Sequence, residues 1–241
     1  CKQPYREVHR YYDSMCRTCG DFNYAKREQT ADLSGRYALV TGARVKIGYQ
    51  ASLKLLRAGA HVVVTTRFPV DAAERYATEP DYAAFRDRLQ VHGLDLRHTP
   101  SVELLARFLA ERLPRLDYLL NNACQTVRRP AGFFRHLVAR ETEALASLPD
   151  ALRTPLLAHA ELCRSVGGAS APRAGELVPA STRVHAEGLV RSAALSQRRY
   201  LDEDFHDGDA LFPAGRYDED RQQVDLREVN SWRLRLHEVE T

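Results

Sequence analysis

Between residues 37 and 120, short hydrophobic runs rich in β-branched residues alternate with longer amphipathic segments. The short runs have the length and composition of buried strands, which we expect at 37–41, 61–67, 89–94 and 116–120. The longer segments carry apolar residues at helical spacing, and we expect helices at 47–58, 70–88 and 101–112. Gly59 stands where glycine commonly ends a helix. Strands separated by helices predict an α/β fold with a parallel sheet.

The alternation of strand and helix stops beyond Cys124. Helical segments are expected at 133–164 and 183–200, with a loop between them at 166–182, where Gly, Ala, Ser and Pro are frequent. The segment 202–220 is acidic and rich in turn-forming residues. The predicted organisation is an N-terminal extension at 1–35, a sheet region at 36–124 and a largely helical or irregular insertion or lid at 125–241.

A glycine-bounded turn, Thr41-Gly42-x5-Gly48, joins the first expected strand to the first expected helix. The first amides of a helix have no partner within the helix and lie at the positive end of its dipole, so they stabilise a phosphate. Gly42 and Gly48 leave room for such a group. The alternative is a tight strand-to-helix connection without a ligand.

Together with Asn121-Asn122-Ala123 after the fourth strand, this turn resembles the nucleotide-binding half of the short-chain dehydrogenase/reductase family. The resemblance covers residues 33–124 and implies a Rossmann-like doubly wound parallel sheet, here partial, with a dinucleotide site in 36–124. The family pattern is Thr-Gly-x-x-x-Gly-x-Gly, and Lys46 occupies the middle glycine position. Lys46 either adds a positive charge beside a phosphate or crowds the site.

The end of the second strand decides between NADP and NAD, because a carboxylate there binds the ribose hydroxyls and repels a 2′-phosphate. This place holds Thr65, Thr66 and Arg67, without a carboxylate. Arg44 and Lys46 add positive charge in the preceding turn, so we predict NADP rather than NAD. The alternative for Arg67 is an ordinary solvated cation.

Further contacts are implied by the resemblance. Asp95 matches the aspartate that faces adenine, although it could instead cap the next helix. Ala123 matches the residue against the cofactor ribose, and Cys124 replaces a glycine and is expected to be a small buried thiol. The predicted cofactor-binding residues are Thr41, Gly42, Arg44, Lys46, Ile47, Gly48, Arg67, Asp95, Asn122 and Ala123.

Charge and hydropathy narrow the classes of partner. The 35 basic and 32 acidic residues give a net charge of +3 spread along the chain, which does not indicate a nucleic-acid partner. No stretch approaches the roughly 18 to 20 apolar residues that span a bilayer. We therefore expect no membrane partner and a cytoplasmic location.

Five cysteines occur in the chain, an odd number that does not indicate a disulfide framework. Cys16 and Cys19 have the Cys-x-x-Cys spacing with which two thiolates hold zinc, and Cys1 offers a third ligand. The fourth ligand is either missing or His9. One branch of the resembling family has a cysteine-rich segment before its first strand, which implies a further ligand before Cys1. Free thiols and a redox pair remain alternatives to zinc.

The family's catalytic Tyr-x-x-x-Lys occurs nowhere in the 241 residues, so no catalytic residue is assigned. One hypothesis is an NADP-dependent oxidoreductase acting on a carbonyl or alcohol of a small molecule, with a homo-oligomeric state as one option. In this hypothesis the sequence is a fragment without the catalytic half. The other hypothesis is a noncatalytic nucleotide-binding or protein-interaction domain.

Overall fold

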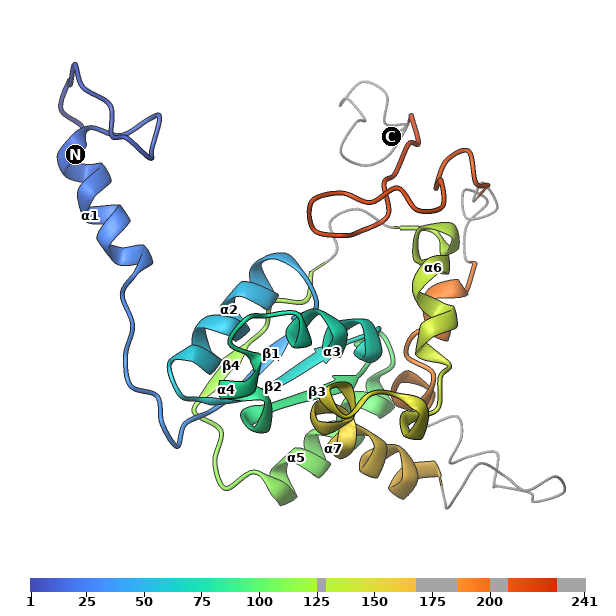
Figure 1. The fold of residues 1–241 in the computed structure, drawn as a ribbon. Coiled ribbons are helices and arrows are strands. Elements are labelled where there is room, and N and C mark those ends of the chain that lie inside the picture. The colour runs from blue at the N-terminus through green and yellow to red at the C-terminus, as the bar shows by residue number, and fades with distance from the viewer. Residues whose placement is uncertain (125–128, 168–185, 200–207, 229–241) are drawn as a thin grey trace, which may run out of the picture. The chain divides into compact units, whose positions relative to one another are not determined.

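A computed structural model of the chain describes residues 1–124, 129–167, 186–199 and 208–228. The chain divides into two compact units, Cys1–Leu33 and Ser34–Thr241 (Figure 1). The first unit contains a single helix, α1 (Arg17–Arg27).

The second unit begins with alternating strands and helices, and its described residues after β4 form helices and turns. Its elements are β1 (Tyr37–Thr41), α2 (Lys46–Arg57), β2 (His61–Thr66), α3 (Pro69–Ala77), α4 (Tyr82–Phe85), the 3-10 turn η1 (Arg86–Arg88), β3 (Leu89–Gly93), α5 (Thr99–Arg112), β4 (Tyr118–Leu120), α6 (Ala131–Glu141), η2 (Leu145–Ser147), α7 (Asp150–Gly167) and η3 (Ala194–Gln197).

The four strands form one parallel sheet in the order β3-β2-β1-β4. In the register, Tyr37 pairs with His61, Ala38 with Tyr118, and Val62 with Leu89. This confirms the predicted α/β fold with a parallel sheet. Because all strands run in the same direction, the turn after β1 and the end of β4 lie at the same edge of the sheet.

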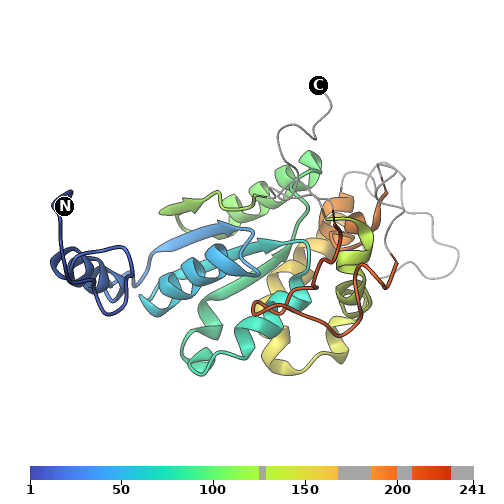
Figure 2. The same cartoon turned by 90° about the horizontal axis from the view of Figure 1, so that it is seen from above.

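Helices cover both faces of the sheet, with α2 and α5 on opposite sides (Figure 2). On the α5 side, Val63 of β2 packs with Leu105 and Phe108 of α5 and with Leu162 of α7. Each such buried side chain stabilises the fold by roughly 1.5–3 kcal/mol. The central strand β2 is buried from Val62 to Thr66, as expected for a strand covered on both faces.

The predicted helix 70–88 is wrong as a single element. It consists of α3, α4 and η1, and the interruption falls around Pro80. Proline has no amide hydrogen and its ring clashes with the preceding helical turn, so the apolar spacing does not continue as one helix. The chain instead forms a turn after α3.

The predicted helix 133–164 is also wrong as a single element. It is divided into α6 and α7, and Leu148 before Pro149 is extended, with ψ 147°. A residue before proline is disfavoured in the helical region. Pro155 is accommodated inside α7, and the carbonyl of Ala151, four residues earlier, accepts a hydrogen bond from the Tyr82 hydroxyl of α4.

The remaining predicted elements lie only partly within the described residues. Of the predicted helix 183–200, residues 186–190 are helical and η3 follows after a turn. Residues 183–185 and 200 of that segment, most of the loop 166–182 and residues 202–207 of the acidic segment lie outside the described part of the chain. Residues 208–220 form turns, as predicted.

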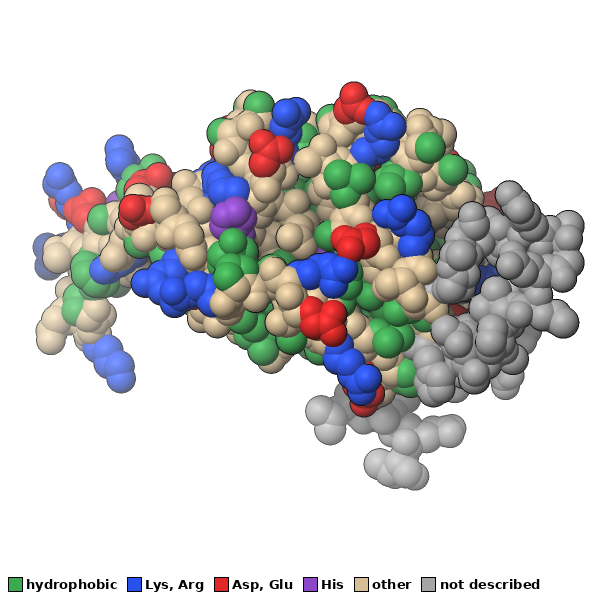
Figure 3. Space-filling view, turned by 90° about the horizontal axis from the view of Figure 1, so that it is seen from below, with side chains coloured by type: hydrophobic (Ala, Val, Ile, Leu, Met, Phe, Trp, Pro, Cys, Tyr) green, Lys and Arg blue, Asp and Glu red, His purple; other side chains and the backbone are tan. Residues whose placement is uncertain are grey.

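The surface drawn in Figure 3 shows basic, acidic and hydrophobic side chains interspersed over the coloured part of the molecule. No large patch of a single charge covers this face. In the part of the chain that is described, none of the helices combines the length and the hydropathy needed to cross a bilayer.

Candidate functional site

The turn after β1 needs residues that tolerate the left-handed region of backbone space. Gly42 has φ +66°, and a Cβ there would lie 2.8 Å from the Cα of Ala123. Lys46 has φ +57°, although it carries a side chain. A non-glycine residue in this region costs about 1–2 kcal/mol. Lys46 therefore adopts a backbone conformation that glycine would adopt without strain.

The turn is tied to the end of β4. The Thr41 hydroxyl accepts hydrogen bonds from the amides of Asn122 and Ala123, both at 3.0 Å. The Asn122 side-chain amide donates to the carbonyls of Thr41 and Gly42, both at 3.1 Å. A Cβ on Gly48 would lie 2.5 Å from the Gly42 carbonyl oxygen and would overlap Asn122. The structure thus brings together Thr41, Gly42, Gly48, Asn122 and Ala123.

The N-terminus of α2 is open at this edge of the sheet. Its N-cap residue, Val45, provides no side-chain hydrogen bond, so the first amides of the helix lack a capping side chain. Ile47 is 78% exposed, which is the highest exposure of any large hydrophobic residue in the described part of the chain. Open amides beside an exposed apolar side chain match the chemistry of a phosphate with an organic group attached.

Arg44 is buried in the turn, and its charge is balanced by the Asp71 carboxylate. Its Nη1 donates to Asp71 at 2.7 Å, and Arg75 donates to the same carboxylate oxygen at 2.7 Å. Burial lowers the pKa of Arg44, and the Asp71 carboxylate opposes this effect. Arg44 is therefore placed to support the turn, with less of its charge left for a ligand.

Arg67 differs from Arg44 because no carboxylate forms an ion pair with it among the described residues. Its guanidinium carbon lies 4.5 Å from the ring centroid of Phe134 in α6 and 5.6 Å from that of Phe68. Burial lowers the pKa of Arg67 to about 10. The Asp95 carboxylate opposes this effect. The alternative interpretation of Arg67 as an ordinary solvated cation is wrong, since its side chain is partly buried and lies over two aromatic rings.

Asp95 is buried after β3 and is held by Arg97. Its Oδ1 accepts hydrogen bonds from the Arg97 amide at 3.0 Å and from Nε at 2.9 Å. Burial alone would raise the pKa of Asp95. The hydrogen bonds from Arg97 outweigh this effect, so the pKa is lowered on balance. The alternative role of Asp95 as the cap of α5 is wrong, because His98 is the N-cap and its side chain accepts from the Ser101 amide.

Two of these features could not be found from the sequence. Phe134, which stacks on Arg67, comes from α6 and lies 67 residues further along the chain. Lys46 forms an ion pair at 3.4 Å with Asp220, and a hollow of about 180 Å³ beside them is lined in part by Tyr49 and Arg75. Neither contact has a signal in local periodicity or spacing. Cys124, predicted to be buried, is exposed.

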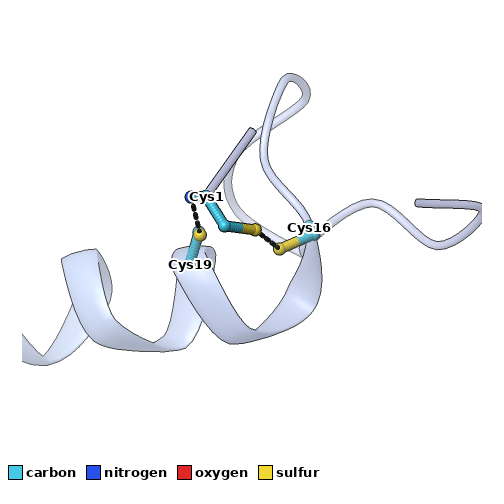
Figure 4. Close-up of side chains that lie close together, drawn as sticks. All are labelled: Cys1, Cys16 and Cys19. Carbon is cyan, nitrogen blue, oxygen red and sulfur yellow. Dashed lines mark hydrogen bonds between the residues drawn. The ribbon is translucent and has the colours of Figure 1, made fainter. Parts of the chain in front are cut away.

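The first unit holds a separate candidate site, formed by three cysteines (Figure 4). The sulfur atoms of Cys1, Cys16 and Cys19 all lie within 4.8 Å of one another. The Cys1 and Cys16 sulfur atoms are 3.7 Å apart, and the Cys1 amino group donates to the Cys19 sulfur at 2.8 Å. Cys16 and Cys19 are brought together because they occupy the N-cap and the first turn of α1.

His9 does not join the three cysteines, so its proposed role as the fourth ligand is wrong. Its Nδ1 accepts hydrogen bonds from the amides of Tyr11 at 3.1 Å and Tyr12 at 3.3 Å. Its Nε2 faces Asp21 at 3.4 Å. Both ring nitrogens are thus directed to other groups.

Residues 36–149 match the family model described as short chain dehydrogenase. Uncharacterized protein R665 of Acanthamoeba polyphaga mimivirus is 42% identical over 132 residues, which are 53% of this chain and 28% of R665. (+)-Neomenthol dehydrogenase of Capsicum annuum is 34% identical over 93 residues, covering 37% of this chain and 29% of that enzyme. A solved short-chain dehydrogenase structure from Streptomyces avermitilis has a TM-score of 0.34 at 23% identity, covering 75% of this chain and 63% of that one.

The matches with the two relatives span less than a third of each relative's length. The fold is established by the parallel sheet of the chain itself. The matched residues include all four strands and the turn from Thr41 to Gly48. Over residues 36–149, the chain is therefore similar to the short-chain dehydrogenase/reductase family.

Proposed function

We propose that this protein is an NADP-dependent oxidoreductase of the short-chain dehydrogenase/reductase type. It would transfer a hydride between the nicotinamide of NADP and a carbonyl or alcohol carbon of a small-molecule substrate. The observation that carries this proposal is the turn at Gly42–Gly48, held by Asn122 and Ala123 against the end of β4. A cytoplasmic location and a homo-oligomeric state remain predictions.

The residues of the turn fit a dinucleotide. The amides at the start of α2 would hold the pyrophosphate, and Ile47 would lose its exposed apolar surface to the cofactor. Gly42 and Gly48 carry no side chain, so nothing collides with Ala123 or Asn122 where the turn approaches the end of β4. The hydride chemistry is supplied by the nicotinamide when it is bound, and the chain's own residues bind and orient it.

Arg67 supports NADP as the cofactor. It lies at the end of β2, where the family distinguishes a 2′-phosphate from a free ribose diol. A partly buried guanidinium that forms no close ion pair among the described residues gains more from a phosphate than a solvated one does, because charged hydrogen bonds are stronger away from water. The stacking on Phe134 holds the guanidinium plane in one orientation.

The proposal leaves the catalytic residues unassigned, because no tyrosine in the sequence is followed four residues later by lysine. In the family such a pair transfers the substrate proton. Asp95, Arg44, Lys46 and Ala123 keep their predicted roles near adenine, the phosphates and the ribose as part of this proposal.

Replacement of Arg67 by glutamine tests the cofactor directly. We expect the native chain to bind NADPH more tightly than NADH in a fluorescence titration. In Arg67→Gln the affinity for NADPH should fall by roughly tenfold or more, because a charged hydrogen bond contributes about 1.5–3 kcal/mol. The affinity for NADH should hardly change.

Arg112→Gln is the matched control. Arg112 also stacks on an aromatic ring, at 3.9 Å from the centroid of Phe108, but it lies on α5 and pairs with Glu161. We expect this variant to bind both cofactors like the native chain. Equal binding of NADPH and NADH by the native chain would remove the argument from Arg67.

The ion pair between Lys46 and Asp220 favours a second candidate, a noncatalytic nucleotide-binding domain. Arg75 also donates to the backbone carbonyls of Asp220 at 2.6 Å and Arg221 at 2.9 Å. These contacts hold a late segment of the chain beside the phosphate-binding turn. Binding of NADPH without its oxidation by any of a panel of aldehydes and ketones would favour this candidate over the oxidoreductase.

A further inference from the structure

We propose that Cys1, Cys16 and Cys19 bind a structural zinc ion within the unit Cys1–Leu33. The three sulfur atoms come from the start of the chain, the N-cap of α1 and the first turn of α1. The two cysteines of the Cys-x-x-Cys pair thus face a third that is 15 residues distant from Cys16. This site is independent of the nucleotide site, which lies wholly in the second unit.

The distances between the sulfur atoms match zinc rather than a disulfide. Zinc holds thiolates at about 2.3 Å in a tetrahedron, so neighbouring sulfur atoms lie about 3.8 Å apart. The sulfur atoms of Cys1 and Cys16 are 3.7 Å apart, and all three lie within 4.8 Å. A disulfide would require about 2.05 Å. An ion at the centre would need only small movements of the side chains.

The unit also lacks the hydrophobic core that would otherwise stabilise it. Within residues 1–33, only His9 and Gly20 are buried. Large apolar side chains such as Val8 and Phe22 are 60% and 64% exposed. Units below about 40 residues usually need a metal, disulfides or association to fold. A zinc ion would supply this stabilisation, because its binding free energy becomes folding free energy.

Backbone contacts already bring the loop before Cys16 back to α1. The amide of His9 donates to the carbonyl of Met15 at 2.8 Å, and Val8 forms an isolated antiparallel bridge with Cys16. The His9 ring packs so closely on Gly20 that a Cβ there would overlap it. The segment between Cys1 and Cys16 is thus folded back on itself, which brings the sulfur atoms of these two cysteines together.

Three thiolates fill three corners of the tetrahedron. Within residues 1–33, no further Cys, His, Asp or Glu ligand atom lies in this group. The fourth corner is therefore filled from outside the group, by water or another ligand. The protein contribution that we propose is limited to the three sulfur atoms.

Metal analysis of the chain of 241 residues, purified without chelator, tests the site. We expect one zinc ion per chain. Cys16→Ser should lose most of this zinc, whereas Cys124→Ser should retain it, because Cys124 is an exposed thiol in the second unit. Absence of zinc from the native chain, or full retention of zinc in Cys16→Ser, would overturn the proposal.

Thiol alkylation of the native chain gives a second readout that needs no variant. Cys1, Cys16 and Cys19 should be protected from iodoacetamide until a chelator is added, and peptide mass analysis identifies each of them. Cys124 should react with or without the chelator and serves as the internal control. Equal reaction of all three cysteines before and after chelation, or a disulfide between two of them, would contradict the proposal.

Discussion

Lys46 departs from the family pattern and adopts a left-handed backbone conformation. It occupies a position where the pattern has glycine, and its φ of +57° is the value that glycine adopts without strain. Its Nζ pairs with Asp220 at 3.4 Å, but both side chains are largely exposed, so the pair contributes little to stability. The motif could be identified from Thr41, Gly42 and Gly48 in the sequence, whereas the conformation at Lys46 could not.

The strain at Lys46 predicts an unusual response to glycine. Lys46→Gly should have a free energy of unfolding equal to the native value or up to about 1 kcal/mol higher, because relief of the left-handed strain exceeds the added entropy of the unfolded chain. Lys54→Gly, further along α2, should be about 1 kcal/mol less stable than the native chain, as for glycine within a helix. Urea denaturation measures both. An equal loss in the two variants would show that Lys46 is not strained.

At the scale of elements, the strands could be predicted closely and several helices could not. The β-branched run His61–Thr66 is buried and therefore carries a clear signal. The helices were predicted as continuous because apolar spacing persists across Pro80 and Pro149, where the chain turns. The packing of α7 beside β3 is a long-range contact, in which His92 lies between Phe108 of α5, at 5.9 Å, and His159 of α7, at 5.8 Å.

Burial of His92 predicts that acid weakens this packing. The side chain is fully buried, and burial lowers its pKa to about 3. Between that value and the unfolded pKa of about 6.5 the unfolded state binds more protons, so stability falls as pH falls below about 6.5. From pH 7 to pH 5, His92 should account for a loss of about 1–2 kcal/mol.

His92→Leu should remove this part of the dependence of the unfolding free energy on pH, whether or not the variant is as stable as the native chain at pH 7. His61→Gln is the control, because His61, at the start of β2, is only partly buried and stacks on Tyr37 at the start of β1. A charged His61 keeps part of its hydration. We therefore expect His61→Gln to change the slope of unfolding free energy against pH less than His92→Leu does. Denaturation at pH 5 and pH 7 measures the difference, and an unchanged slope in His92→Leu would contradict this explanation.

At the scale of the whole molecule, the helices after β4 are part of the second unit. Phe68, which follows β2, packs with Phe133 and Phe134 of α6 and with Phe212 near the end of the described chain. The sequence predicted a largely helical or irregular insertion here, but gave no sign that α6 would cover Arg67. The reason is that contacts between residues so far apart depend on the complete fold. The three cysteines, by contrast, could be grouped from their spacing.

Hydrogen exchange of the chain with and without saturating NADPH tests the central claim most directly, because it locates the bound cofactor. The turn at 41–48 and the end of β4 at 121–124 should become protected, since they form the proposed phosphate and ribose contacts. Residues 1–33 should exchange as before, because they form a separate unit. Unchanged exchange at 41–48 in the presence of NADPH would contradict the proposed nucleotide site.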